Sequence, residues 1–337
     1  MATEVAPTPA PGVSRPAGRL LLLVAVVGLA GILAVLLGLT AYYLKTRRPV
    51  TQLPVVEQVT SAVAPRQLFS FAEVARPVGI AVSPDGQLIY VAEGGGARLI
   101  KVFDRDGRPV RSLAPPDSKP GTRKPSSLAV DGVGRLFAVD RLRAAIDVYT
   151  PTGSWETTWQ PPIVASLGGW LPNGISIGPD GKVYVTEVGQ AQHRVLVFAP
   201  DGTLVNVLSQ ETGLPDGLKY PVQAVADEEG RIYVSDAMNG RVLAVSPQGV
   251  SSVGVVGDEA VTLPIGVAVA GQRLFVADAA AHRIAVFRVG DRPSYLHSFG
   301  DSEDDDGMAY PQAVALDGVG RLYIADRTND RVQVWTY

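Results

Sequence analysis

Six segments of the chain follow one pattern, and each of them begins with a proline. Successive prolines are 43 to 49 residues apart, and each is followed by an apolar run, a turn and a second run that ends in Asp or Glu. The hexapeptide DGVGRL forms part of this pattern twice, at Asp131–Leu136 and at Asp317–Leu322. A period in this range is typical of repeat architectures, and propeller blades are the β form of them. The prolines are Pro77, Pro125, Pro172, Pro221, Pro264 and Pro311.

Each repeated segment divides into short runs that have the composition of β-strands. The runs are rich in β-branched and aromatic residues and are separated by turn residues. Many are apolar at consecutive positions, which suits strands that are covered on both faces. Asp-Gly and Gly supply the positive φ of a tight hairpin, so DGVGR is predicted to join the first two strands of a blade. The sequence therefore predicts an all-β, six-bladed propeller with four-stranded blades over residues 66–337.

The last repeat contains only three strand runs before the chain stops at Tyr337. The segment Gln67–Phe71, which precedes the first repeat, resembles outer-strand runs such as Ser294–Phe299. We expect Gln67–Phe71 to supply the missing fourth strand, because this would protect a sheet edge and join the two ends of the domain. Deletion of this segment should then open the ring.

The repeat resembles the NHL repeat, with the pattern P-x-G-I-A-V-x-x-D-G-x-L-Y-V-A-D-x-x-N-x-R-V-x-V-F. The match is best at Pro311–Trp335, where Asp326, Asn329 and Arg331 fall in frame. It is also good at Pro221–Val245. The resemblance covers residues 67–337 and implies a six-bladed propeller, but it does not imply one particular function.

The N-terminal region contains the uncharged 25-residue stretch Leu20–Leu44. About 20 apolar residues span a bilayer as a helix, and no small-x-small cleavage site follows this stretch. Tyr42 and Tyr43 stand where interfacial aromatic residues are common. The sequence predicts a disordered tail at 1–19, a single-pass transmembrane helix at 20–44 and a linker at 45–65.

The charges that flank this stretch leave its orientation open. Arg15 and Arg19 precede it, whereas Lys45, Arg47 and Arg48 follow it, which slightly favours a cytoplasmic propeller. The resemblance to exported NHL-type proteins implies the opposite side. We predict a single-pass membrane protein with an extracytoplasmic propeller.

The composition argues against several classes of site. The net charge of −3 and the isoelectric point near 5.7 give no whole-chain reason to expect nucleic-acid binding. The absence of cysteine excludes disulfides, thiolate metal sites and a cysteine nucleophile. The sequence contains no phosphate-binding loop, nucleophile elbow or HExxH motif.

An acidic residue ends the second strand run of every repeat, and this position allows two interpretations. A ring of six carboxylates could bind a metal ion. An arginine five positions later in four repeats instead favours acid–arginine pairs across a hairpin loop. In the second repeat Ala145 replaces the arginine, so we expect Asp140 to be the carboxylate most available for binding. The six acids are Glu93, Asp140, Glu187, Asp236, Asp278 and Asp326.

Three histidines and one acidic loop are the other candidates for a metal site. His193 and His282 occupy equivalent repeat positions, and His297 lies in an outer-strand run. The resemblance to propeller lyases implies His-based sites and that to lactonases implies a central calcium, but the residues assemble neither ligand set. The loop Asp301–Asp306 could hold Ca²⁺ or be solvated, and it departs from the EF-hand order. We predict no cofactor and no small-molecule substrate, with Ca²⁺ as the alternative.

The loops next to the six acids should share one face of the propeller, and they vary most between repeats. Basic and aromatic side chains on this face suit a protein partner. We predict a scaffold or assembly factor in the cell envelope; the alternative is a metal-dependent hydrolase or lyase with a site at the central channel. RNA binding, which some NHL propellers show, is not expected for an acidic domain. The partner-binding candidates are Arg123, Lys124, Asp140, Arg141, Arg143, Trp170, Lys219, Asp305 and Tyr310.

Overall fold

The computed structural model describes residues 65–161, 169–189, 192–214, 216–253, 261–301 and 307–337. The predicted membrane helix Leu20–Leu44, its preceding tail and the linker up to residue 64 lie outside the described residues. In the described part of the chain, no helix is long and apolar enough to cross a membrane.

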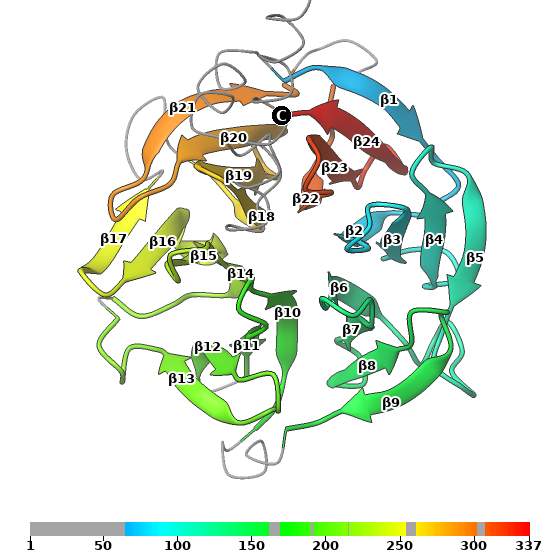
Figure 1. Cartoon of the computed structure of the whole chain (residues 1–337), viewed down its shortest axis with the longest axis horizontal. Helices are drawn as coiled ribbons and strands as arrows, with labels where there is room; N and C mark the ends of the chain where they lie inside the picture. Colours follow the sequence, from blue (N-terminus) through cyan, green and yellow to red (C-terminus); the bar gives the residue numbers. More distant parts are fainter. Residues whose placement is uncertain (1–64, 162–168, 190–191, 215, 254–260, 302–306) are drawn as a thin grey trace, which may run out of the picture. The chain divides into compact units, whose positions relative to one another are not determined.

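The described residues form six four-stranded antiparallel sheets around a central axis, as predicted (Figure 1). The inner strands are β2 (Pro77–Val82), β6 (Pro125–Val130), β10 (Pro172–Ile177), β14 (Pro221–Ala226), β18 (Pro264–Ala270) and β22 (Pro311–Leu316). The second strands are β3 (Leu88–Glu93), β7 (Leu136–Asp140), β11 (Val183–Val188), β15 (Ile232–Asp236), β19 (Arg273–Asp278) and β23 (Arg321–Asp326). The third strands are β4 (Ile100–Asp104), β8 (Ala145–Tyr149), β12 (His193–Phe198), β16 (Arg241–Ser246), β20 (Arg283–Arg288) and β24 (Arg331–Thr336). The outer strands are β5 (Pro109–Leu113), β9 (Trp155–Trp159), β13 (Leu204–Leu208), β17 (Gly249–Val253), β21 (Ser294–Phe299) and β1 (Gln67–Phe71).

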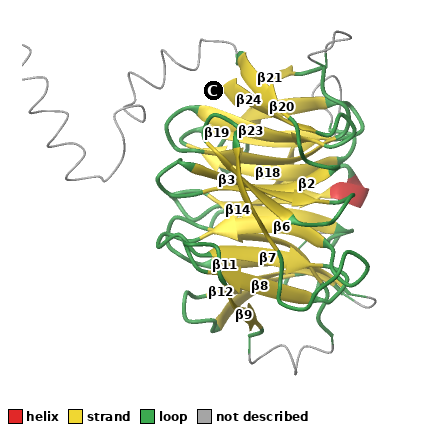
Figure 2. Cartoon of the chain, turned by 90° about the vertical axis from the view of Figure 1, so that its right-hand side faces the viewer, coloured by secondary structure: helices red, strands yellow, loops and turns green. Residues whose placement is uncertain are grey.

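Each blade places its leading proline and its acid at the same end of the sheet. Pro77 pairs with Glu93 in blade 1, and Pro311 pairs with Asp326 in blade 6. We call the face of the disc formed by these ends the proline face. The opposite face, formed by the turns between first and second and between third and fourth strands, is the turn face. The short helix η3 (Ala237–Asn239) lies on the proline face, at the right of Figure 2.

Each inner strand is irregular directly after its proline. In blade 1, for example, the pairing register shifts between Pro77 and Gly79, and the other five inner strands show similar shifts. Such bulges bend a strand and change the direction of a side chain. The residue after the proline lines the central cavity in all six blades. These residues are Val78, Ser126, Asn173, Val222, Ile265 and Gln312.

Glycine allows neighbouring inner strands to approach closely in alternate blades. A Cβ atom on Gly174 would lie 1.9 Å from the carbonyl oxygen of Val222, and one on Gly79 would lie 2.6 Å from that of Ser126. Gly266 occupies the same position in blade 5. Because the obstructing atoms are backbone atoms, these contacts leave no room for a side chain.

Strand β1 completes the last blade, which confirms the predicted ring closure. It pairs antiparallel with β24, and Phe71 lies opposite Val332. The Phe71 ring packs on Phe103 of blade 1 with a centroid distance of 4.7 Å. The strand before the first repeat therefore joins the first blade to the last.

The hydrophobic core is divided among the junctions between neighbouring blades. The described residues form six clusters of buried side chains, and each cluster contains residues from two adjacent blades. Leu196, Tyr233 and Ile324, from three different blades, are fully buried. Strands covered on both faces account for the consecutive apolar residues of the sequence.

The first copy of DGVGRL forms a turn that its own aspartate stabilises. Oδ1 of Asp131 accepts hydrogen bonds from the backbone N–H groups of Val133 and Arg135. Oδ2 accepts a hydrogen bond from Nε of Arg135 at 2.8 Å. The hexapeptide is therefore a structural turn on the turn face.

The second copy of DGVGRL also takes part in ring closure. Asp317 binds the corresponding backbone N–H groups, but Arg321 donates from Nη1 to the carbonyl oxygen of Arg105 in blade 1 at 2.8 Å. The guanidinium also lies 5.9 Å from the centre of the Phe69 ring on β1. One arginine thus contacts both segments that close the ring.

Candidate binding site at the mouth of the central channel

A cavity of about 450 Å³ lies at the proline-face end of the central channel. Five basic residues line it, and no Asp or Glu is present in the lining formed by the described residues. Cavities of this size accommodate small ligands or a few residues of a peptide. The basic residues are Arg76, Arg98, Lys124, Arg141 and Arg327.

The acids that end the second strands bind the backbone that enters their own blades. Buried Asp326 accepts the N–H of Ala309 at 2.7 Å through Oδ1. Its Oδ2 accepts hydrogen bonds from Asn329 at 2.9 Å and from Nε of Arg331 at 2.8 Å. Asp236 makes the same three types of bond in blade 4. Acid–arginine pairs also occur in blades 3 and 5, as Glu187–Arg194 and Asp278–Arg283.

This pattern supports the structural interpretation of the ring of acids. A buried carboxylate is stable when hydrogen-bond donors and an opposite charge surround it, and these partners occupy its oxygen atoms. Over the described ranges of the chain, no three or more His, Asp or Glu side chains are grouped so that they could hold a metal ion.

The predicted pair between Glu93 and Arg98 is wrong. Glu93 instead accepts the backbone N–H groups of Ala75 and Leu99, at 3.2 Å each. The Arg98 guanidinium turns toward blade 2 and donates to the carbonyl oxygen of Arg123 at 3.4 Å. Nε of Arg123 in turn donates a hydrogen bond of 3.0 Å to the carbonyl oxygen of Arg98. Arg98 therefore ties two blades together instead of pairing within its own blade.

The expectation that Asp140 is the most available carboxylate is also wrong. Its Oδ1 accepts the backbone N–H groups of Lys124, Leu142 and Arg143 at 3.0 to 3.1 Å. The Arg143 guanidinium lies 3.8 Å from Oδ2. Ala144, with a φ of 49°, turns the loop so that Arg143 replaces the arginine that the third strand lacks.

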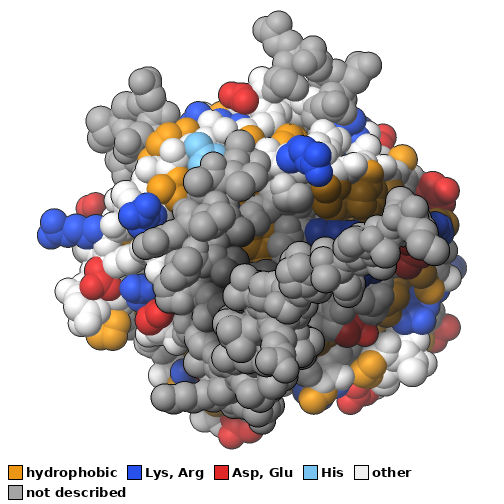
Figure 3. All heavy atoms as spheres, turned by 45° about the horizontal axis from the view of Figure 1, so that its top comes forward, with side chains coloured by type: hydrophobic (Ala, Val, Ile, Leu, Met, Phe, Trp, Pro, Cys, Tyr) orange, Lys and Arg blue, Asp and Glu red, His pale blue; other side chains and the backbone are white. Residues whose placement is uncertain are grey.

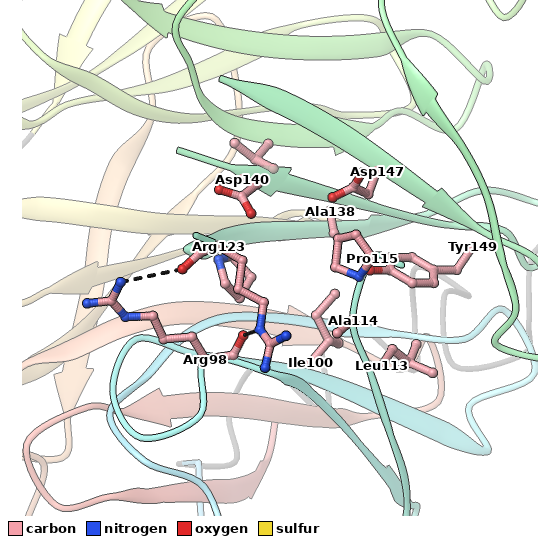
Figure 4. A pocket seen from close by; sticks show the side chains of 12 residues that line it. Arg98, Ile100, Leu113, Ala114, Pro115, Arg123, Ala138, Asp140, Asp147 and Tyr149 are labelled. Carbon is pink, nitrogen blue, oxygen red and sulfur yellow. Dashed lines mark hydrogen bonds between the residues drawn. The ribbon is translucent and has the colours of Figure 1, made fainter. Parts of the chain in front are cut away.

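A small pocket between blades 1 and 2 lies beside Asp140 (Figure 4). Figure 4 shows Arg98 and Arg123 near one another, with Asp140 and Asp147 above them and the Tyr149 ring to the side. The pocket volume is about 10 Å³, enough for at most one water molecule. Burial raises the pKa of Tyr149, and the charge of Asp147 raises it further, so the hydroxyl stays protonated. This pocket is a junction between blades, not a ligand site.

Three residues at the mouth hold a left-handed backbone conformation. Arg76, Tyr220 and Tyr310 have φ values of 48°, 60° and 62°, and each directly precedes the proline of its blade. This conformation is unfavourable for residues that carry a side chain, and it persists where the surroundings hold it in place.

Side chains of the preceding blade provide this support. Nδ1 of His193 accepts the N–H of Tyr220 at 3.1 Å, and Nδ1 of His282 accepts the N–H of Tyr310 at 3.0 Å. Asp330 accepts the corresponding N–H of blade 1 at 2.7 Å. The two histidines therefore occupy equivalent positions because each one binds the backbone that enters the next blade.

His297 differs from the other two histidines because it lies on the outer strand β21. Its Nε2 atom is buried without a hydrogen-bond partner among the described residues. Burial lowers the pKa of His297, and the positive charge of Arg273 lowers it further. The neutral form is thus favoured in the folded protein.

We expect His297 to make the folded protein less stable in mild acid. The unfolded chain binds a proton at a higher pH than the folded chain, so stability is lost as the pH falls below about 6.5. Thermal melts of wild type and His297→Gln across this range test the effect. The variant should show the smaller loss of thermal midpoint, and equal losses would contradict the prediction.

The structure brings three of the partner-binding candidates together around the cavity. Lys124, Arg141 and Tyr310 line it, and exposed Lys219 lies in the loop that enters blade 4. Arg123, by contrast, is only 7% exposed.

The remaining candidates lie elsewhere or outside the described residues. Arg143 pairs with Asp147 at 2.6 Å, and half-buried Trp170 packs against the cluster between blades 2 and 3. Asp140 is buried as described above, and Asp305 lies outside the described residues.

Three basic residues of the cavity were not among the candidates predicted from the sequence: Arg76, Arg98 and Arg327. Arg76 directly precedes a blade proline, and Arg327 directly follows a blade acid. A comparison of these two positions across the six repeats would have identified both arginines as candidate binding residues. Arg98 was instead assigned to a pair with Glu93.

Comparison with known proteins identifies the fold but no family. No protein-family model matches the chain, and no curated protein matches it either. Virginiamycin B lyase from Staphylococcus aureus is similar in structure, with a TM-score of 0.57 and 17% identity over 81% of this chain and 100% of that chain. The chain has the fold of a six-bladed β-propeller.

Two further structures show the same likeness. A protein of unknown function from Bacteroides thetaiotaomicron has a TM-score of 0.59 and 15% identity, over 81% of this chain and 72% of that chain. A chain of the nidogen/laminin complex has a TM-score of 0.53 and 18% identity, over 66% of this chain and 79% of that chain. At these identities the similarity shows the fold alone.

Proposed function

We propose that this chain is a membrane-anchored, NHL-type propeller that binds a protein partner as a scaffold or assembly factor in the cell envelope. Leu20–Leu44 would form the anchor and residues 45–65 the linker. The propeller would lie outside the cytoplasm, with its partner site on the proline face. Reporter fusions at the C-terminus test the side of the membrane.

The observation that carries this proposal is the contrast between acids and bases on the proline face. The acids point into the structure and are bound by backbone and arginine groups. Lys124, Arg141 and Arg327 line an open cavity. Their side chains take part in none of the ion pairs formed among the described residues. Basic and aromatic groups around a concave surface suit partner recognition.

The clustering of bases around the cavity is a local feature. On the surface seen in Figure 3, basic and acidic side chains are interspersed with hydrophobic ones. The structural neighbour from the nidogen/laminin complex also supports a protein-binding role for a propeller of this shape.

Charge reversal at the cavity should weaken partner binding. In the full-length chain, Lys124→Glu combined with Arg141→Glu replaces attraction by repulsion at two sites, each worth about 1 kcal/mol. We expect at least a roughly tenfold loss of partner in quantitative co-purification from detergent-solubilised membranes. The thermal midpoint should remain unchanged, because the bonds of Lys124 to Asp140 and of Arg141 to Lys124 are made by backbone atoms.

A double variant on the turn face provides the matched control. Arg108→Glu and Lys182→Glu change an exposed and a half-buried cation in turns of blades 1 and 3. Co-purification that is equally strong in both double variants would refute the proposed site. Arg143 and Trp170 are left intact because they pair and pack within the fold.

A second candidate function is a propeller lyase or hydrolase with a site at the central channel. The cavity at the channel mouth and the similarity to virginiamycin B lyase favour it. Incubation of the purified protein with virginiamycin B and divalent metal ions, followed by chromatography, tests it directly. Consumption of the compound would favour this candidate over the first.

A further inference from the structure

The mouth of the central channel has a cationic half and an apolar half. We infer that it recognises a peptide segment in which carboxylate side chains stand next to apolar ones. This inference rests on the proposed protein-binding function and specifies the chemistry of the partner.

Two positions of the repeat supply most of the rim of the mouth: the residue before the proline and the residue after the acid. Of these twelve residues, all except Leu171, Val188 and Ala279 line the cavity. Blades 6, 1 and 2 are neighbours in the ring, because β2 packs between β22 and β6 (Figure 1). Their residues at these positions are Tyr310, Arg327, Arg76, Gly94, Lys124 and Arg141. The corresponding residues of blades 3, 4 and 5 are Leu171, Val188, Tyr220, Ala237, Leu263 and Ala279.

All the charged residues at these twelve positions are therefore basic and belong to one half of the ring. Among the residues that the structure describes, the side chains of Arg76, Lys124, Arg141 and Arg327 form no ion pair. The carboxylates of Asp330 and Asp140 bind only the backbone N–H groups of Arg76 and Lys124. Like charges gathered at one rim repel each other, and a bound anion removes that repulsion. The cationic half is complementary to carboxylates.

Two of the arginines are already oriented for such a ligand. The Arg141 guanidinium lies 5.6 Å from the centre of the Tyr220 ring, and that of Arg327 lies 5.4 Å from the centre of the Tyr310 ring. A cation–π contact places the guanidinium over the ring without using its N–H groups in hydrogen bonds, so they can make a bidentate bond to a carboxylate. The backbone of each tyrosine is in turn held by a histidine of the preceding blade.

The other half of the mouth offers contacts for apolar side chains. Met238 on η3 is 59% exposed, and half-buried Leu263 lines the cavity beside it. Val222 and Ile265 continue this surface into the channel. An RNA ligand would require phosphate contacts along an extended basic surface, whereas half of this mouth is uncharged. A short peptide with both kinds of side chain matches both halves.

Selection from a phage-displayed library of random peptides tests the inference. The full-length protein in detergent should select peptides enriched in both Asp or Glu and Leu, Ile, Met or Phe. The affinity of a selected peptide, measured by fluorescence polarisation, should fall at least about tenfold in Arg76→Glu combined with Arg327→Glu. The turn-face variant Arg108→Glu with Lys182→Glu should bind as wild type does.

A second pair of variants tests the apolar half separately. Met238→Ser combined with Leu263→Ser should lower the affinity for a selected peptide several-fold. The same substitutions should hardly change the affinity for a peptide whose apolar residues are replaced by serine, because that peptide no longer makes the apolar contact.

Three results would overturn the inference: no enrichment of acidic residues, undiminished affinity in the Arg76 and Arg327 double variant, or binding of polyuridine RNA in place of peptides. The proposed function remains distinguishable from this inference. If Lys124 and Arg141 are needed to co-purify a membrane partner but no acidic peptide is selected, the scaffold role stands and the peptide chemistry is wrong.

Discussion

Deletion of residues 66–72 is expected to lower the thermal midpoint of the propeller by about 10 °C or more. The deletion removes β1, so Phe69 and Phe71 leave the cluster between blades 6 and 1. Burial of each ring contributes about 2 to 3 kcal/mol, and each kcal/mol is worth about 2 °C or more in a domain of this size. The deletion also exposes the edge of β24, which favours association between molecules. Calorimetry and light scattering measure the two effects.

Moving the same strand to the other end of the domain is the matched control. The N–H of Thr336 donates to the carbonyl oxygen of Arg66 at 2.8 Å, so the end of β24 lies beside the start of β1. A short Asn-Gly turn can therefore join Tyr337 to a transplanted copy of residues 66–72 as an antiparallel hairpin. This variant should recover most of the lost stability. If the deletion variant has the same thermal midpoint as wild type, β1 does not contribute to the stability of the ring.

Substitution of Gly174 by alanine should be nearly as damaging, although it adds one methyl group. Its Cβ would lie 1.9 Å from the carbonyl oxygen of Val222 and 2.9 Å from Oγ1 of Thr186. Thr186 itself donates to this carbonyl at 2.9 Å, so the clash also disturbs a bond between blades. Neither backbone can move without displacing an inner strand. We expect a loss of at least about 3 kcal/mol, measured by denaturant unfolding.

Gly132→Ala is the control for this substitution. Gly132 lies in the turn of DGVGRL, where an added Cβ atom would have no neighbouring atom within 4 Å, and its φ is not positive. The change should alter stability by less than about 0.5 kcal/mol. Equal losses in the two variants would mean that the close approach of blades 3 and 4 is not what selects glycine.

The fold was predictable because the information for it is local and repeated. Consecutive apolar residues and Asp-Gly turns define each strand and its ends, and six copies reinforce the same interpretation. Ring closure was predictable too, because Gln67–Phe71 has the composition of an outer strand. The pairs of Asp236 with Arg241 and Asp326 with Arg331 followed from spacing alone, since they bridge one short hairpin.

The binding site was less predictable because it depends on contacts between blades. Arg98 has the spacing of a partner for Glu93, but the loop of blade 2 offers it carbonyl oxygens instead. Blade 2 has Ala145 where other blades have the arginine that pairs with the acid. The left-handed backbone of Ala144 allows Arg143 to take the place of that arginine beside Asp140. Arg76 and Arg327 could be selected by comparing equivalent positions of the six repeats, but that these positions surround a cavity follows from the arrangement of the blades.

The buried acids have a consequence for how such a domain can change its specificity. Buried Asp140 and Asp326 bind the backbone of the loops beside them through bonds that do not involve the half-buried side chains of Arg141 and Arg327. Gly94, Arg141 and Ala237 occupy the same position on three otherwise similar frameworks. New recognition surfaces could therefore evolve, or be designed, by exchanging mouth residues one blade at a time while the ring that carries them stays unchanged.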